Sequence, residues 1–452
     1  MIASGETQSL CPICLKRCEA VFETLGDETY MVKTCSEHGT FKTRVWKGSP
    51  AMGEWNRPKI RATIAHPVTK VEKGCPYDCG LCEDHRQHTC TALIEVTERC
   101  NLHCRFCFAD ADASGQNPDA DLPIETIRFQ FEQTMKISGA CNIQLSGGEP
   151  TVRDDLPEIV KIGREIGFKF IQVNTNGIRL AEDASYVRAL KEAGLDSVFL
   201  QFDGTEDAIY KALRGRALFE VKKKAIENCA AFGIGVVLVP TLVPGINDHN
   251  IGEIVRFGMS KAPDVRSVHF QPVSYFGRVP TPPKDEDRIT LPEVMAALQD
   301  QTQGMVQSES LKPPGCENAL CSFHGNYMIE GDRLVQLTKR ESCCCGGDTC
   351  APEKAEEGAV KAIEFVSRNW SGNRLRTASP KESEGELSDW DRILKTIKRK
   401  SFSISAMAFQ DVWNVNLERI KDCCIHVVTP EGKLIPFCMY NLTRSDGKTL
   451  YR

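Results

Sequence analysis

Apolar runs with strand-like spacing alternate with amphipathic segments over residues 92–301 of this 452-residue chain. The runs occupy residues 92–97, 142–146, 168–173, 197–202, 234–242 and 267–273. Apolar residues at helical spacing mark the segments between them, at 124–137, 155–166, 183–193, 218–232 and 249–259. Six strands joined by helices predict consecutive β–α units, and therefore an α/β fold with a parallel sheet.

The rest of the chain divides into cysteine-rich and polar segments. Residues 1–68 and 69–91 carry cysteines ahead of the core, and residues 302–366 carry a further set behind it. Residues 367–388 are polar and charged, which predicts a flexible linker. The final segment, 389–452, predicts a helix and a hairpin, because a Pro-Glu-Gly turn separates two strand-like runs.

Charge and composition narrow the class of protein. A net charge of -5 and a pI near 6.1 give no electrostatic footprint for nucleic acid. The N-terminal residues lack the pattern of a secretory signal, and no apolar run reaches the roughly 18 residues of a transmembrane segment. We therefore expect a cytoplasmic protein, in which clustered thiols among the 22 cysteines bind metal rather than form disulfides.

Two motifs follow the first two predicted strands. Cys100, Cys104 and Cys107 have CxxxCxxC spacing after the first strand, and the turn at residues 147–150, with the sequence GGEP, follows the second. Because the carboxyl ends of parallel strands meet at one rim of a sheet, both motifs are expected at the same place. Three thiolates on one loop can bind three irons of a 4Fe-4S cluster and leave the fourth iron open to a small molecule. A zinc site is the alternative, but zinc needs a fourth ligand that this loop lacks.

The cysteines ahead of the core form two sets. Cys11, Cys14 and Cys35 have the spacing of a zinc ribbon or a rubredoxin-like iron site, and the fourth ligand is Cys18, His38 or a residue farther along. The second set fits an auxiliary 4Fe-4S cluster or a mononuclear metal, and its members are Cys75, Cys79, Cys82 and Cys90. Its position just before the first core strand would suit electron delivery to the first cluster.

A third set lies behind the core, where another auxiliary cluster is expected. Its predicted ligands are Cys316, Cys321, Cys345 and Cys350. Adjacent cysteines cannot easily all face one metal, so one or two of residues 343–345 are expected to be non-ligands or reactive thiols. The cysteines at 423, 424 and 438 either join this site or lie in the terminal hairpin. Isolated cysteines at 141 and 229 are expected to be structural.

The cysteine loop and the glycine turn together resemble the radical S-adenosylmethionine (SAM) enzymes. The resemblance covers residues 92–301 and implies a partial (β/α)6 TIM barrel core with small metal-binding modules at both ends. It implies that Cys100, Cys104 and Cys107 bind the catalytic cluster, that SAM binds the open iron, and that a small donor such as ferredoxin or flavodoxin supplies electrons. The implied SAM-binding residues are Phe106, Gly147, Gly148, Glu149, Asn174, Asn176, Gln201 and Arg214.

The resemblance also gives these residues their expected roles. The backbone at Phe106 is expected near the adenine, and the glycine turn is expected at the methionine amine, where glycine permits close backbone approach. Asn174 and Asn176 are expected to line the pocket, and Gln201 stands where relatives often have serine. Arg214 is expected to pair with the SAM carboxylate, a task suited to a bidentate guanidinium.

A narrower resemblance covers most of the chain and carries the substrate expectation. The order of CPICLKRC, GCPYDCGLCEDHRQHTC, CNLHCRFC, IQLSGGEPT and CCIHVV is similar to the tetraether synthase family, whose members have auxiliary clusters and couple lipid chains. This implies hydrogen abstraction from an unactivated C–H bond, a lipid substrate and peripheral contact with a membrane. The CCCGG run resembles the branch called radical SAM (seleno)protein TrsS, which implies a maturase for a protein or cofactor of a redox enzyme. A third hypothesis is a multi-cluster electron-transfer protein, which would not need an open iron.

Overall fold

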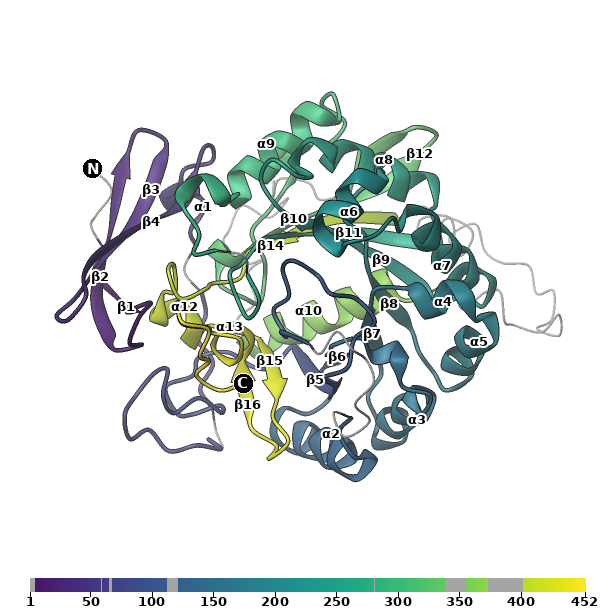
Figure 1. Cartoon of the computed structure of the whole chain (residues 1–452), viewed down its shortest axis with the longest axis horizontal. Helices are drawn as coiled ribbons and strands as arrows, with labels where there is room; N and C mark the ends of the chain where they lie inside the picture. Colours follow the sequence, from purple (N-terminus) through teal and green to yellow (C-terminus); the bar gives the residue numbers. More distant parts are fainter. Residues whose placement is uncertain are drawn as a thin grey trace, which may run out of the picture.

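The computed structural model describes residues 5–57, 59–64, 67–111, 121–279, 281–337, 355–372 and 401–452. At its centre lies an arc of parallel strands in the order β5-β6-β7-β8-β9-β11 (Figure 1). These strands are β5 (Thr91–Thr97), β6 (Asn142–Gly147), β7 (Ile171–Thr175), β8 (Ser197–Gln201), β9 (Gly235–Val239) and β11 (Val265–Pro272). The short β10 (Thr241–Leu242) also pairs with β11. The α/β fold predicted from the alternating runs is confirmed.

Helices cover the outer face of this arc (Figure 1). They are α2 (Ile124–Ser138), α3 (Leu156–Ile166), α4 (Ile178–Glu182), α5 (Ala184–Glu192), α6 (Asp207–Arg214), α7 (Phe219–Ala231), α8 (Ile251–Ser260) and α9 (Leu291–Gln301). Alternate strand residues such as Ile94 and Val173 are fully buried in one cluster with helix residues such as Phe131. Because side chains alternate along a strand, the remaining positions form the inner face of the barrel.

Segments behind the core extend the same sheet at both edges. Beyond β11 lie β14 (Ser401–Met407), which is parallel to it, and then β12 (Ser322–Glu330) and β13 (Arg333–Gln336), which are antiparallel. Beyond β5 lies β15 (Ile425–Val428), which is parallel to β5 and forms a hairpin with β16 (Leu434–Pro436). The hairpin expected in residues 389–452 is therefore an edge of the core sheet. Two short helices, α12 (Leu417–Lys421) and α13 (Phe437–Tyr440), flank it.

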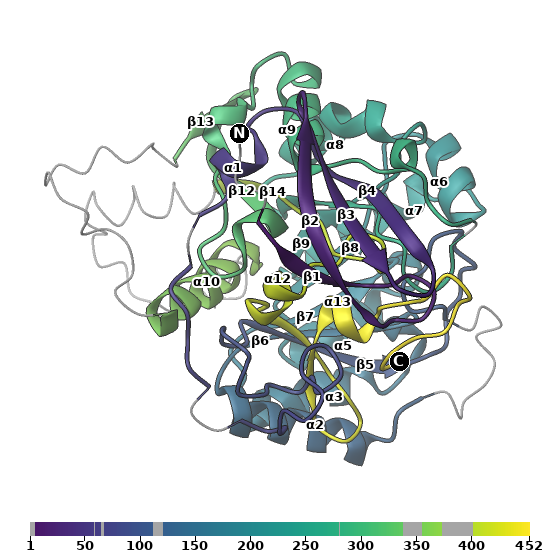
Figure 2. The same cartoon turned by 90° about the vertical axis from the view of Figure 1, so that its left-hand side faces the viewer.

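The N-terminal module is a separate antiparallel sheet of β1 (Thr7–Leu10), β2 (Arg17–Leu25), β3 (Glu28–Cys35) and β4 (Gly39–Lys47). Figure 2 shows it across one side of the barrel, where β4 contacts α9 and β1 contacts α12. Buried Lys33 joins it to the C-terminal segment by donating to the Val412 carbonyl at 2.6 Å. The short α1 (Met52–Trp55) follows, and turns and an isolated bridge make up the described part of residues 56–90.

One further helix, α10 (Ala355–Trp370), lies within the arc of strands and contacts β6, β9, β11 and β14 (Figure 1). Its last residue packs on the inner-face side chains of Phe199 and His269, with ring centroids 5.7 Å and 5.8 Å away. The predicted linker, 367–388, therefore begins inside a helix, because Trp370 finds apolar partners there. Residues 373–388 lie outside the described residues. Within the described part of the chain, no helix has the length and apolar character needed to cross a bilayer.

Candidate active site and metal centres

The three cysteines of the first motif lie together on the loop that follows β5. Cys100 and Cys104 are buried and Cys107 is partly exposed, and all three belong to one cluster of side chains. Burial raises the pKa of the Cys100 thiol to about 12, and the charges of Glu149, Cys104 and Cys107 add to the effect. Three thiols gathered on one loop, one of them with a raised pKa, form a donor set that fits a metal cluster, because a bound cation favours the thiolate form.

Arg278 holds this loop in place from the segment that follows β11. Its backbone pairs with that of Cys107 through two hydrogen bonds of 2.9 Å and 3.1 Å. Its guanidinium donates to the Ala111 carbonyl at 2.7 Å and to the Asp110 carboxylate at 2.9 Å. The preceding Gly277 has a φ of +54°, and a Cβ there would lie 2.6 Å from the Cys107 oxygen. Sequence analysis did not identify Arg278, because no local motif marks it.

The glycine turn after β6 packs directly against the start of the cysteine loop. A Cβ on Gly147 would lie 2.2 Å from the Thr97 oxygen, and one on Gly148 would lie 2.1 Å from the Arg99 oxygen. Only glycine permits this close approach. As a result, the Gly148 amide donates to the Thr97 backbone carbonyl and the Glu149 amide donates to the Arg99 backbone carbonyl, both at 2.8 Å. The backbone of the turn is thereby fixed beside the cluster loop.

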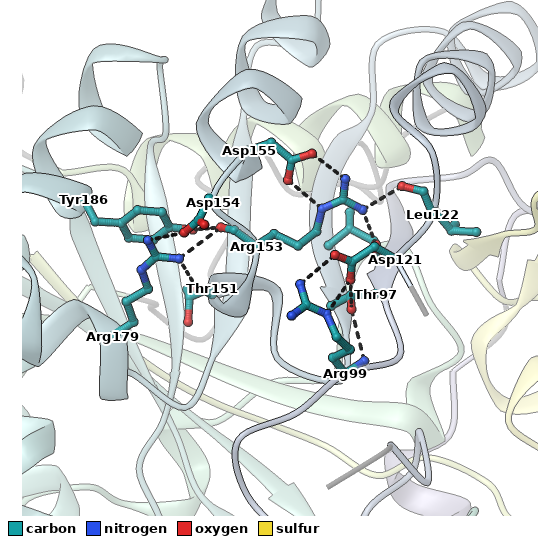
Figure 3. Close-up of polar contacts among 11 residues, drawn as sticks. Thr97, Arg99, Asp121, Leu122, Thr151, Arg153, Asp154, Asp155, Arg179 and Tyr186 are labelled. Atoms are coloured by element: carbon teal, nitrogen blue, oxygen red, sulfur yellow. Dashed lines mark hydrogen bonds and ion pairs between the residues drawn. The ribbon is translucent and has the colours of Figure 1, made fainter. Parts of the chain in front are cut away.

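A network of arginines makes the two motifs rigid relative to each other (Figure 3). The Arg99 guanidinium forms a bidentate pair with Asp121, at 2.9 Å and 2.6 Å. Arg153 pairs with Asp155 and also donates to two backbone carbonyls at the end of β5 and the start of the α2 segment, both at 2.7 Å. Arg179 donates to the backbone of the glycine-turn segment at 2.9 Å. Bidentate pairs of this kind fix orientation as well as distance.

The Glu149 carboxylate accepts hydrogen bonds from neighbouring residues of the protein with both of its oxygens. It accepts hydrogen bonds from the Thr151 amide at 3.1 Å, the Thr151 hydroxyl at 2.6 Å and the Thr175 hydroxyl at 2.7 Å. Its second oxygen accepts from the Asn176 amide at 2.6 Å. The Asn176 side chain donates to Asn101, the residue after the first cysteine, at 2.6 Å. The ends of β6 and β7 are thus tied to the cluster loop.

The remaining predicted SAM-binding residues lie at the same rim. Arg214 is buried and donates to both oxygens of Asp203 at 2.7 Å. Burial alone would lower the pKa of Arg214, but the charge of Asp203 outweighs burial and raises it, and nearby Cys104 adds to the rise. The Gln201 carboxamide lies 3.1 Å from the Arg214 Nε. Asn174 Oδ1 is buried and has no hydrogen-bond partner among the described residues, as a ligand-binding atom would.

Phe106 packs beside Tyr275, with ring centroids 6.4 Å apart. The structure therefore brings the eight residues expected to bind SAM to one rim together with the three cysteines. Buried cations, an unsatisfied amide oxygen and a fixed backbone turn suit the charged and polar groups of SAM.

The N-terminal sheet carries its own metal site. The donor atoms of Cys11, Cys14, Cys35 and His38 all lie within 4.8 Å of one another, and the His38 Nδ1 is 3.5 Å from the sulfurs of Cys11 and Cys35. Hydrogen bonds from the Glu37 backbone and then from His38 lower the pKa of the Cys35 thiol to about 6. Cys18 lies beside this set, and its thiol donates a hydrogen bond to the Lys16 carbonyl at 3.4 Å. Three thiolates and one imidazole are a zinc donor set.

The other cysteines are grouped differently from the sequence expectation. Cys90 was expected to join Cys75, Cys79 and Cys82, but its sulfur lies within 4.8 Å of those of Cys316 and Cys424. The strand pairing of β15 with β5 causes this, since the Cys90 amide donates to the Cys424 carbonyl at 2.8 Å.

Cys75, Cys79 and Cys82 stay together and line one cavity with His85 and Lys421. Cys321 was expected to join Cys316, but the group of sulfurs around Cys316 does not include it. Its sulfur accepts a hydrogen bond from Arg419 at 3.2 Å. Cys345 and Cys350 lie outside the described residues, as does the whole 343–345 run.

Comparison with known proteins agrees with this geometry. Residues 94–258 match the radical SAM superfamily, and residues 3–47 match the HMPTM N-terminal zinc ribbon domain. The chain is 35% identical over 481 residues to a 7,8-dihydro-6-hydroxymethylpterin dimethyltransferase of Methanocaldococcus jannaschii, with 96% of this chain and 93% of that protein covered. It is 34% identical over 176 residues to a probable GTP 3',8-cyclase of Methanothermobacter marburgensis, with 39% and 55% covered.

Solved structures that match part of the chain include Streptococcus suis SuiB, at a TM-score of 0.39 and 17% identity over 49% of this chain and 46% of SuiB. Another is HydG, a maturase of the FeFe-hydrogenase, at a TM-score of 0.37 and 15% identity over 48% and 50%. The whole-chain similarity, the superfamily match and the site geometry lead to one conclusion: this chain belongs to the radical SAM superfamily and carries an N-terminal zinc ribbon.

Proposed function

We propose that this radical SAM enzyme methylates a small polar heterocycle of the reduced-pterin class. The similarity to the pterin dimethyltransferase runs through nearly the whole of both chains, so the proposal rests on more than the shared core. When bound, the 4Fe-4S cluster and SAM supply a 5'-deoxyadenosyl radical that removes hydrogen from a substrate carbon. A small electron donor such as ferredoxin or flavodoxin is the expected partner.

A row of polar side chains on three strands of the inner face is the observation that supports a polar substrate. Gln144 donates to Gln172 at 2.9 Å, and Gln172 donates to Ser197 at 3.0 Å, so amides and hydroxyls cross three neighbouring strands. Asn174 and Ser146 form a second pair at 3.4 Å, nearer the SAM-binding rim. A ladder of such groups can exchange hydrogen bonds with a flat heterocycle that has several donors and acceptors.

Saturated lipid chains would gain little from such a wall. They offer no hydrogen bonds to the amides and hydroxyls of this ladder. Coupling of lipid chains, as in tetraether synthases, and maturation of a redox enzyme, as expected for the TrsS branch, stay predictions.

The protein's own residues bind and orient the reactants in this proposal. Arg214 and the glycine turn hold the methionine part of SAM, and the cysteine loop stays fixed through Arg278. The partly exposed amide of Gln144 orients the heterocycle, and fully buried Gln172 holds that amide in place. Their pairing with each other keeps them in place before substrate binds, which reduces the entropy lost on binding.

An anaerobic assay with three substrates tests the proposal. The reconstituted enzyme, SAM and dithionite are combined with 7,8-dihydro-6-hydroxymethylpterin, with a saturated membrane lipid, or with neither. We expect the pterin to stimulate 5'-deoxyadenosine formation. When a methyl donor is also present, either a second equivalent of SAM or another one-carbon donor, the pterin should exchange a hydrogen for a methyl group and gain the mass of CH2. Stimulation by the lipid alone would refute the substrate class and leave the radical chemistry standing. Stimulation by neither would favour a protein or cofactor substrate instead.

A matched pair of variants links the assay to the inner face. Gln172→Leu removes the central amide of the ladder, whereas Gln8→Leu removes an exposed amide of the zinc ribbon. We expect Gln172→Leu to lower the pterin-stimulated rate by about 10- to 100-fold, the effect of an unpaired hydrogen-bond partner. The substrate-free cleavage of SAM should stay as in the wild type, and Gln8→Leu should change neither rate. Equal loss of both rates in Gln172→Leu would show a general structural effect.

A further inference from the structure

Cys75, Cys79 and Cys82 line one cavity and lack the fourth cysteine that the sequence led us to expect. That residue, Cys90, belongs to a different group of cysteines. The three sulfurs at the cavity do not all lie within 4.8 Å of one another, whereas the four donor atoms of the zinc ribbon do. Donors spread more widely than those around a single ion fit a 4Fe-4S cluster, so we searched the cavity wall for a fourth ligand.

Four other side chains with polar atoms line this cavity, and they are Asp78, Asp84, His85 and Lys421. Asp78 is engaged, because its Oδ2 accepts from three successive backbone amides at 2.8, 2.5 and 2.7 Å. Lys421 pairs with Glu418 at 2.7 Å, and an ammonium has no lone pair to offer a metal. Asp84 is exposed, and iron in a thiolate site is better matched by imidazole than by a carboxylate. His85 is therefore the best candidate.

The imidazole of His85 is held in the orientation that a metal ligand needs. The residue is only 5% exposed, and its Nε2 lies 2.8 Å from the Cys423 backbone carbonyl. A carbonyl can only accept a hydrogen bond, so the proton of the neutral ring is on Nε2 and the lone pair is on Nδ1. His426 approaches the same Nε2, at 3.2 Å.

The second ring nitrogen of His85 is left free by these contacts. Within the described residues, Nδ1 of His85 has no hydrogen-bond partner, and it is not sealed off by protein atoms as Nδ1 of His426 is. A histidine that binds a metal through one nitrogen commonly donates its other N–H to a backbone carbonyl, which fixes the tautomer and the ring plane. His85 has this arrangement at the wall of a cavity that three cysteines share.

We propose that His85 is the fourth protein ligand of an auxiliary 4Fe-4S cluster bound by Cys75, Cys79 and Cys82. Nδ1 would bind the iron that three thiolates leave open. Because a neutral imidazole takes the place of an anionic thiolate, this cluster should be easier to reduce than one with four cysteines. The inference depends on this metal site and not on the substrate, so a failed pterin assay leaves it unchanged.

Pulsed electron paramagnetic resonance of the reduced clusters tests nitrogen ligation. The enzyme is labelled with 15N-histidine, reconstituted anaerobically and measured without SAM, whose amine would add its own nitrogen coupling. We expect a coupling typical of a directly bound imidazole, and it should change with the label. His85→Cys should keep the iron content, lose this coupling and shift the reduction potential of the cluster to a more negative value. Absence of the coupling in the wild type, or its survival in His85→Cys, overturns the proposal.

Iron content separates His85 from its neighbours. His85→Ala should lose about one iron per chain, because three thiolates bind three irons. His88→Ala is the matched control, since this nearby histidine is 36% exposed and pairs with Glu356 at 3.2 Å. His88→Ala and Asp84→Asn should both keep the iron and the nitrogen coupling, and loss of the coupling in either variant while His85→Ala keeps it overturns the proposal. If His85→Ala loads no cluster at this site, His85→Cys decides, because cysteine restores a four-thiolate site.

Discussion

Replacing Cys90 by alanine tests which cysteines share a metal site. The structure places its sulfur within 4.8 Å of those of Cys316 and Cys424, whereas its sequence neighbours are Cys79 and Cys82. If the three grouped cysteines bind one 4Fe-4S cluster, each single alanine variant should lose about four irons. The double variant Cys90→Ala/Cys424→Ala should lose no more than either single variant, because both changes remove the same site.

The double variant Cys90→Ala/Cys82→Ala should instead lose about eight irons, because it removes two sites of about four each. Iron and sulfide are measured after anaerobic reconstitution, together with the electron paramagnetic resonance of the reduced clusters. Cys141→Ala is the control, since this buried cysteine belongs to none of the groups of potential metal ligands found among the described residues. A loss of only about four irons in Cys90→Ala/Cys82→Ala would refute the grouping and restore the four-cysteine run.

Three further changes have defined outcomes. His38→Ala should remove zinc from the N-terminal module and His38→Cys should keep it, while Cys18→Ala should leave the zinc content unchanged; elemental analysis of the purified protein measures all three. Gly148→Ala should lower the free energy of unfolding by about 1–3 kcal/mol and reduce cluster loading, because the new Cβ meets the Arg99 carbonyl. Gly5→Ala, in open space, should do neither. A normal iron content in Gly148→Ala would contradict the clash. Burial lowers the pKa of His269 to about 4. As pH falls, this histidine takes up a proton in the unfolded chain before it does so in the folded protein, so the free energy of unfolding should drop by about 3 kcal/mol between pH 6.5 and 4. Thermal unfolding measured at several pH values should show a smaller loss of stability in acid for His269→Asn than for the wild type. Parallel profiles would contradict the assignment.

Local patterns predicted the core because each strand and helix of the barrel carries its own periodicity. The run 197–202 corresponds to β8 (Ser197–Gln201) almost residue for residue. The run 168–173 begins early, since β7 starts at Ile171. Gly167 ends α3 with a φ of +114°, and Phe168 then packs in the core from a turn, outside the hydrogen-bonded ladder. Apolar residues alone cannot separate a buried turn from the start of a strand.

The candidate site was predictable only where one segment carries the whole signal. Cys100 to Cys107 lie on one loop, and Gly147 and Gly148 lie on one turn. Arg278 carries no such signal, because its contacts with the cysteine loop depend on how separate segments pack. The inner-face amides were also missed, since single polar residues within apolar strands do not reveal which face they occupy until the sheet is assembled.

The regrouping of the cysteines shows why spacing misled. β15 pairs with β5 so that Ile425 lies opposite Thr91, and this register brings Cys424 beside Cys90. Cys423 lies between the end of α12 and the start of β15, and it is not part of the group formed by Cys90, Cys316 and Cys424. Its sulfur instead donates to the Ile425 carbonyl at 3.2 Å. The pairing of β15 with β5 therefore places Cys424, and not its neighbour Cys423, beside Cys90. The spacing of cysteines within either segment cannot predict this, because the two strands are more than three hundred residues apart in the sequence.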